Sequence, residues 1–125
     1  MLVSYLQAML AHDVGFAQLN LPFGEIQSTP LIVAAERGGH GVAEVLLNSG
    51  ADPNMPNMNQ VTPLHAAVTQ GHYGCVTALL QHAGTNVNAK DWKGLTPIYL
   101  AVQHRRTEML EGLLARGANA NMAPD

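Results

Sequence analysis

The chain has 125 residues, of which 47% are hydrophobic and 12% are charged, so it can fold and forms at most one domain. Its formal net charge of −3 gives no electrostatic reason to expect a nucleic-acid partner, because phosphate binding needs clustered Lys and Arg, and only Arg105 and Arg106 are adjacent. The single cysteine, Cys75, excludes an internal disulfide and fits a reducing compartment.

Residues 1–23 are predicted to form an N-terminal helical cap or a partial repeat. Met1–Leu10 is apolar, but it lacks a basic start and is too short to span a bilayer, so we expect a helix here and neither an export signal nor a membrane span. Without an export signal the protein is expected to be intracellular, in the cytoplasm, the nucleus or both. The apolar residues that would form one face of this helix are Leu2, Tyr5, Leu6, Met9 and Leu10.

From residue 24 onward the sequence repeats itself. A Thr-Pro pair followed by Leu or Ile recurs at intervals of 33 and 34 residues, beginning at Thr29, Thr62 and Thr96. A Leu-Leu pair and a Gly- and Asn-containing loop follow each of these, and the loops are 50–54, 84–88 and 117–121. A fixed period of this length indicates a stack of small units that bury their apolar faces only against one another. The predicted units are repeat one (24–54), repeat two (55–88) and repeat three (89–125).

Each unit is predicted to contain two short helices. In repeat two, Thr62 can cap free amides and Pro63 suits the first helical position, because its missing N–H would be unpaired there in any case. Gly71 is predicted to end this first helix, and a second helix follows with Cys75 in its apolar face. Two short helices joined by a glycine turn form an antiparallel pair.

These motifs resemble the ankyrin repeat family over roughly residues 24–121. Repeat two carries Thr62-Pro63-Leu64-His65, two alanines, Gly71-His72 and a Leu-Leu pair at the spacing of that family. The resemblance implies an all-α repeat protein, an ankyrin-type solenoid of antiparallel helix pairs joined by protruding β-hairpin loops. It also implies a non-enzymatic module for protein–protein interaction, such as an adaptor or a regulatory domain. An architectural segment of a larger scaffold, with no partner of its own, is the alternative.

Three features depart from the family pattern. Gln27 and Gln60 stand where it has the hairpin glycine, so distorted hairpins are expected there. In repeat three Arg105-Arg106 replaces Gly-His, and Tyr99 replaces the first histidine. Repeat two holds one extra residue, which predicts a bulge around Ala83-Gly84. No capping helix is visible before Asp125, which predicts either a fragment of a longer repeat array or a short product whose Leu113/Leu114 helix is exposed on one side.

Catalytic and metal-binding chemistry is not expected. Zinc sites need three or four ligands with tight local pairs, whereas the resemblance implies that His65 and His72 bond to backbone between repeats. Cys75 is most simply a core residue. A small hydrolase is the enzymatic alternative, but no Gly-x-Ser-x-Gly elbow and no phosphate-binding glycine loop is present. We therefore expect no metal, no cofactor and no small-molecule substrate.

The loop asparagines at the ends of the repeats are expected to bond to neighbouring backbone. The family resemblance implies a further possibility, because an asparagine that closes such a loop eight residues after a leucine is a target of asparaginyl hydroxylation. The candidates for hydroxylation are Asn54, Asn88 and Asn121.

The partner surface implied by the resemblance is the concave face formed by hairpin tips and inner helices. Trp92 is predicted to be its main anchor, because exposed aromatic residues are common at the centres of interfaces. The partner is expected to be a protein, with no nucleic acid or membrane. Carried over position by position, the predicted surface consists of Glu25, Ile26, Ser28, Glu36, Arg37, Met58, Asn59, Val61, Thr69, Gln70, Trp92, Lys93, Leu95, Gln103 and His104.

Overall fold

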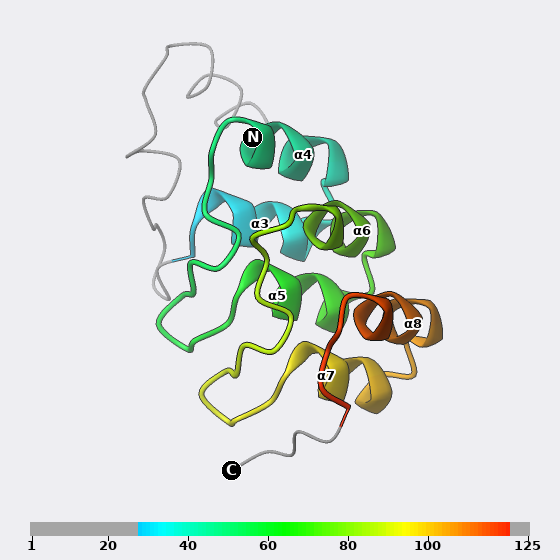
Figure 1. Cartoon of the computed structure of the whole chain (residues 1–125). Helices are drawn as coiled ribbons and strands as arrows, with labels where there is room; N and C mark the ends of the chain where they lie inside the picture. Colours follow the sequence, from blue (N-terminus) through cyan, green and yellow to red (C-terminus); the bar gives the residue numbers. More distant parts are fainter. Residues whose placement is uncertain (1–27, 121–125) are drawn as a thin grey trace.

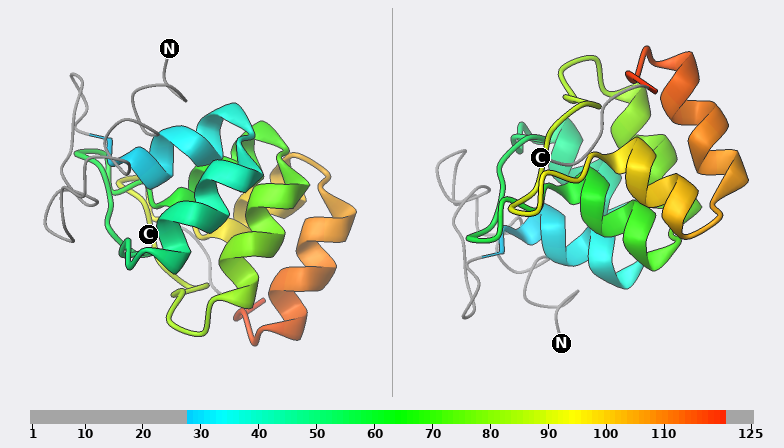
Figure 2. Two further views of the ribbon diagram at one scale, coloured as in Figure 1. Left: turned by 90° about the horizontal axis from the view of Figure 1, so that it is seen from above. Right: turned by 90° about the horizontal axis from the view of Figure 1, so that it is seen from below.

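A computed structural model describes residues 28–120, which form three stacked helix pairs. The inner helices α3, α5 and α7 lie in one layer, the outer helices α4, α6 and α8 lie in a second, and the long loops protrude beside the inner layer (Figures 1 and 2). The predicted all-α repeat solenoid is therefore confirmed. The helices are α3 (Pro30–Arg37), α4 (His40–Asn48), α5 (Pro63–Gln70), α6 (Tyr73–Gln81), α7 (Pro97–Gln103) and α8 (Thr107–Ala115).

Two predicted features stand differently. The N-terminal cap at 1–23 lies outside the described residues. No β-strand ladder is assigned between residues 28 and 120, so the predicted hairpins are loops closed by turn hydrogen bonds. Each helix pair falls inside one predicted repeat, and the repeat boundaries themselves stay a prediction.

The three inner helices begin in the same way, as the Thr-Pro pairs predict. The Thr29 hydroxyl accepts a hydrogen bond from the Ile32 N–H (3.2 Å), and Thr96 accepts one from Tyr99 (3.3 Å). Such a cap satisfies an amide that the first helical turn leaves unpaired, and proline follows each of these threonines. Each Thr-Pro pair therefore fixes where an inner helix starts.

The core runs between the two layers. Leu46, Leu79 and Leu113, the first residue of each Leu-Leu pair, are fully buried. Alanines at 34, 67 and 101 on the inner helices are also buried, and their small side chains allow successive helix pairs to pack closely. The apolar surface of each repeat is therefore covered mainly by the repeats on either side of it.

The hairpin at Gln60 is not distorted, and that expectation was wrong. The Gln60 N–H donates to Asn57 O (3.0 Å), as the Gly94 N–H donates to Asp91 O in repeat three (2.9 Å). Gln60 takes the left-handed conformation that Gly94 also takes, with φ values of 61° and 79°. The hairpin keeps its geometry, and the non-glycine residue bears the backbone strain. The corresponding Gln27 lies outside the described residues.

Arg105 takes over a glycine position in the same way. Gly38 and Gly71 follow α3 and α5 with φ values of 78°, and Arg105 stands at the same place after α7 with φ of 57°. The next residue donates its N–H to the helix in each case, and the Arg106 N–H reaches Ala101 O at 2.7 Å. The helix ends as it does in the other repeats, although left-handed backbone is costly for arginine.

Arg106 stands where the pattern has histidine and makes the same kind of contact. His72 Nε2 donates to Glu36 O (3.0 Å) in the preceding repeat, and the Arg106 guanidinium donates to Thr69 O (3.2 Å). The glycine above each side chain is needed for this approach. A Cβ at Gly71 would lie 2.8 Å from Arg106 Cζ, and a Cβ at Gly38 would lie 2.7 Å from the His72 ring.

The extra residue of repeat two lies in the loop after α6, as predicted. In repeats one and three a backbone N–H, of Ala51 and Ala118, bonds to the carbonyl of the buried leucine. In repeat two the Thr85 hydroxyl makes this bond to Leu79 O instead (2.7 Å). Arg116 of repeat three donates to the carbonyl of Leu80 at the end of α6 and to carbonyls of this loop. Side chains thus satisfy the backbone that the insertion displaces.

The last described repeat exposes positions that are buried in the others. Val68 is 0% exposed beneath repeat three, whereas Val102 at the same place on α7 is 59% exposed. Tyr99 and Leu114 are likewise exposed, although Ile32 and Leu47 at matching places are buried. Stacking of the next repeat is therefore what buries these positions in repeats one and two.

Arg105→Gly should stabilise the protein. Replacing a left-handed arginine by glycine removes a backbone strain of about 1–3 kcal/mol and adds unfolded-state entropy, so we expect a net gain of about 1 kcal/mol in the free energy of unfolding. Urea denaturation followed by circular dichroism measures this gain.

The matched control is Glu111→Gly, in the middle of α8, where the backbone is helical and the side chain is exposed. It should lower the free energy of unfolding by about 1 kcal/mol. A loss of stability in Arg105→Gly as well would show that position 105 is not strained.

Candidate functional site

The tips of two successive hairpins carry the two most exposed large apolar side chains in residues 28–120. Met58 is 65% exposed and Trp92 is 64% exposed, at the same position of their repeats. The Trp92 N–H donates to Asn59 O (3.0 Å), which fixes the two tips side by side. Lys93 Nζ lies 5.1 Å from the centre of the Trp92 ring, a cation–π distance.

These tips are held by side-chain hydrogen bonds within each turn. One Asp91 carboxylate oxygen accepts from the N–H groups of Lys93 and Leu95, both at 2.9 Å. Asn57 Oδ1 accepts from Asn59 and Val61 in the same way (2.9 and 3.1 Å). The carboxamide replaces the carboxylate with the same geometry, so both turns are ordered without any partner. Trp92 is thus presented on a fixed turn.

The structure places the other predicted surface residues unevenly. Ser28 is only 5% exposed, so it offers no surface to a partner, and including it was wrong. Val61 and Leu95 are half-buried and pack against the core, as their apolar character makes favourable. Glu25 and Ile26 lie outside the described residues. The side chains that remain accessible are Glu36, Arg37, Met58, Asn59, Thr69, Gln70, Trp92, Lys93, Gln103 and His104.

Glu36 is the one accessible acid on an inner helix of the described stack. It is half-buried, and this burial raises the pKa of its carboxyl group, while the charge of Arg37 lowers it. Its backbone carbonyl accepts a hydrogen bond from the His72 side chain. Glu36 is therefore partly committed to the contact between repeats one and two.

His65 connects repeats two and three. Its Nε2 donates to Leu95 O (2.9 Å), and its Nδ1 accepts from the Thr62 N–H (3.2 Å), which completes a capping box at the start of α5. The predicted backbone bonding of His65 and His72 is confirmed. Between residues 28 and 120 no group of three His, Cys, Asp or Glu is placed to hold a metal ion.

The loop asparagines also connect repeats. Asn54 accepts from the Asn86 N–H (2.7 Å) and donates to Gly84 O (2.8 Å), and Asn88 accepts from the Asn119 N–H (2.9 Å). Bonding to neighbouring backbone is thus confirmed for Asn54 and Asn88. Asn121 lies outside the described residues. Hydroxylation of the three asparagines stays a prediction.

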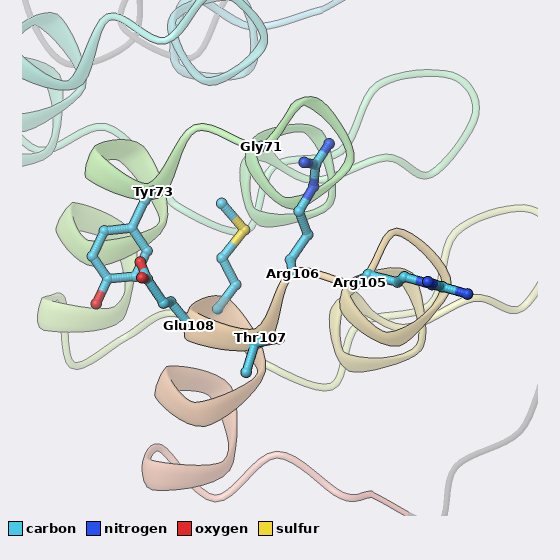
Figure 3. Close-up of a pocket in the computed structure, with 7 residues that line it drawn as sticks. Gly71, Tyr73, Arg105, Arg106, Thr107 and Glu108 are labelled. Carbon is cyan, nitrogen blue, oxygen red and sulfur yellow. The ribbon is translucent and has the colours of Figure 1, made fainter.

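Sequence reasoning missed a shallow hollow at the opposite ends of the helices, beside the turn that joins α7 to α8 (Figure 3). Tyr73 and Glu108 line it together, Arg106 points to Gly71, and Arg105 points away. Tyr73 is exposed, but its position lies in the variable part of the repeat, so no sequence signal indicates it. The hollow is open to solvent, and no convergent set of catalytic groups lines it.

The remaining reactive group is part of the core. Cys75 is buried and donates to Ala34 O (3.8 Å), and its burial raises the pKa of the thiol. A thiol of this kind is a poor nucleophile, so the predicted core role of Cys75 is confirmed. None of the helices described here is long and apolar enough to cross a bilayer.

The geometry of paired helices, threonine caps and histidine bridges agrees with a family comparison. The family model "Ankyrin repeats (3 copies)" matches residues 31–123. The chain belongs to the ankyrin-repeat family. Proteins built from ankyrin repeats are generally non-enzymatic modules for protein–protein interaction.

Several curated relatives resemble the chain over most of its length. It is 36% identical to the Neurogenic locus Notch protein of Drosophila melanogaster over 103 residues, covering 82% of this chain and 4% of that protein. It is 35% identical to NF-kappa-B inhibitor alpha of Mus musculus over 101 residues, covering 77% and 32%. For Transient receptor potential cation channel subfamily A member 1 of Homo sapiens the identity is 35% over 91 residues, covering 73% and 8%. The chain therefore spans a third or less of these relatives.

His65→Ala should destabilise the ankyrin stack by about 1 kcal/mol or more, because it leaves Leu95 O and the Thr62 N–H without their partner. Thermal unfolding measures the loss. His104→Ala, at an exposed position after α7, is the matched control and should change stability by less than about 0.5 kcal/mol. Added zinc should not alter the melting temperature, and a zinc-dependent rise that His65→Ala abolishes would contradict the structural role.

The free energy of unfolding should also fall as the pH drops below 6.5, the ordinary pKa of the His65 side chain. Burial lowers the pKa of His65, while the Leu95 carbonyl and the charge of Asp91 oppose this shift. The unfolded chain therefore binds the proton more readily, and stability is lost as the pH falls through the unfolded and then the folded pKa. Urea denaturation above and below pH 6.5 tests this, and His65→Gln should show a shallower loss than the natural chain.

Proposed function

We propose that the chain binds a protein partner through its hairpin tips and the accessible faces of α3, α5 and α7. The exposed indole of Trp92 is the observation that carries this proposal. Leaving an indole in water forgoes a large burial energy, and the turn that holds it has its hydrogen bonds satisfied without the ring. Trp92 therefore contributes little to folding and is available for binding.

The neighbouring residues suit an interface anchor. Met58 lies at the adjacent tip, and a thioether side chain adapts its shape to a partner. Lys93 beside the ring supplies a polar edge, and aromatic residues surrounded by polar ones are typical of energetic hot spots. The partner contact would centre on Trp92 and Met58 and extend along the inner helices.

Family and relatives support a binding role without naming the partner. NF-kappa-B inhibitor alpha is, by its name, an inhibitor, and Transient receptor potential cation channel subfamily A member 1 is, by its name, a member of a cation channel subfamily. Sequences similar to this chain thus occur in proteins of different kinds. We propose a non-enzymatic role, as an adaptor or regulatory domain, for the present chain. An intracellular location is part of this proposal and would suit its single buried thiol.

Trp92→Ala should weaken partner binding by about 2 kcal/mol or more, because it removes the central apolar anchor. The free energy of unfolding should change by less than about 0.5 kcal/mol, because the ring contributes little to the fold. Quantitative pull-down with immobilised natural and variant chains, together with thermal unfolding, measures both effects.

The control is Tyr73→Ala, which removes an exposed aromatic ring from the start of α6, away from the hairpin tips. It should retain every protein that Trp92→Ala loses. Equal retention by the natural chain and Trp92→Ala would favour the architectural alternative. Blue-shifted tryptophan emission from the free protein would mean that the ring is buried, which would also contradict the proposal.

A further inference from the structure

Basic side chains are concentrated in repeat three. Of the six Lys and Arg residues in the chain, only Arg37 lies outside it. Two of the others are committed to backbone, since Arg106 donates to Thr69 O and Arg116 donates to Leu80 O in α6. The exposed basic residues of repeat three are Lys93, at the hairpin tip, and Arg105, after α7. Lys93 therefore stands beside the exposed anchor of the proposed surface.

Exposed acids in the described residues lie elsewhere. Glu44 is on α4 and Glu108 and Glu111 are on α8, which are outer helices, and Asp52 lies in the loop after α4 of repeat one. The acid nearest to Lys93 in sequence is Asp91, whose carboxylate accepts two backbone N–H groups of its own turn. The hairpin side of repeat three thus presents a cation next to an indole, with its one adjacent carboxylate occupied.

We propose that the Trp92–Lys93 tip recognises an acidic protein segment that carries a large apolar side chain next to Asp or Glu. The apolar side chain would cover Trp92 and Met58, and the neighbouring carboxylate would pair with the Lys93 ammonium. This inference rests on the proposed function and specifies the chemistry of its partner.

Charge complementarity favours this occupant over others. A basic segment would meet the Lys93 charge at the centre of the contact, and an opposed like charge is unfavourable. A nucleic acid needs several clustered cations, whereas Arg106 and Arg116 are turned to the backbone of the preceding repeats. A single exposed ammonium beside an aromatic ring suits one carboxylate beside one apolar side chain.

Selection of a random-peptide display library on the full chain tests the partner chemistry. The enriched peptides should contain Asp or Glu next to Trp, Phe, Leu or Met. One enriched peptide is then synthesised with a fluorescent label, and its affinity is measured at low and high salt. Higher salt should weaken its binding, because the carboxylate–ammonium pair is exposed. Enrichment of neutral or basic peptides, or no enrichment, overturns the proposal.

Variants of the chain then identify the residues that bind the synthetic peptide. Lys93→Glu should weaken binding of the synthetic peptide about fivefold or more, because the variant replaces a charge attraction by a repulsion. Arg105→Glu makes the same charge change at an exposed position of repeat three that lies outside the proposed surface, and it should have little effect on peptide binding. Trp92→Ala should weaken binding of the peptide about thirtyfold. If Trp92→Ala weakens peptide binding but Lys93→Glu does not, the acidic partner is overturned and the proposed function is not. If Trp92→Ala leaves peptide binding unchanged, the proposed function is overturned too.

Discussion

Backbone carbonyls at the ends of α3 and α5 have no donor within their own helix, and side chains of the next repeat supply one. His72 donates to Glu36 O and Arg106 donates to Thr69 O. Asn54 and Asn88 connect successive loops from the other side, since each accepts a hydrogen bond from a backbone N–H of the following repeat. An unpaired carbonyl in a buried place costs free energy, so each repeat is complete only when its neighbour is docked. This dependence explains why three helix pairs without long-range strands form one stack.

This constraint concerns hydrogen-bond geometry more than residue identity. Arg106 replaces a histidine because a guanidinium also donates across the repeat boundary and fits under a glycine. Thr85 replaces a backbone amide where the loop is one residue longer. At two glycine positions, Gln60 and Arg105 keep the required left-handed backbone at the cost of strain. At these positions another side chain or a strained residue keeps the hydrogen bond or the backbone geometry of the family pattern.

The sequence predicted those features of the fold that depend on a single residue, namely the starts and ends of helices. Thr-Pro pairs mark the helix starts, and Gly71 marks the end of α5, because capping and left-handed backbone depend on one residue each. The geometry of the Gln60 hairpin could not be predicted from the sequence. It depends on the hydrogen bonds that Asn57 makes within the turn and on the packing of the following hairpin, residues 91–95, against it. The burial of Ser28 was also not predicted from the sequence.

The candidate site consists of residues that are not needed to hold the fold. The side-chain hydrogen bonds that His65, His72 and Arg106 make between repeats are part-buried, and the turn bonds of Asp91 and Asn57 hold the hairpins from within. Folding therefore makes no demand on the side chains at the tips, and residues there can change without loss of the stack. Met58 and Trp92 occupy the same position of successive repeats, yet they differ in size and in their polar neighbours. A large aromatic side chain at a position that folding leaves unconstrained is most simply explained by a partner that covers it.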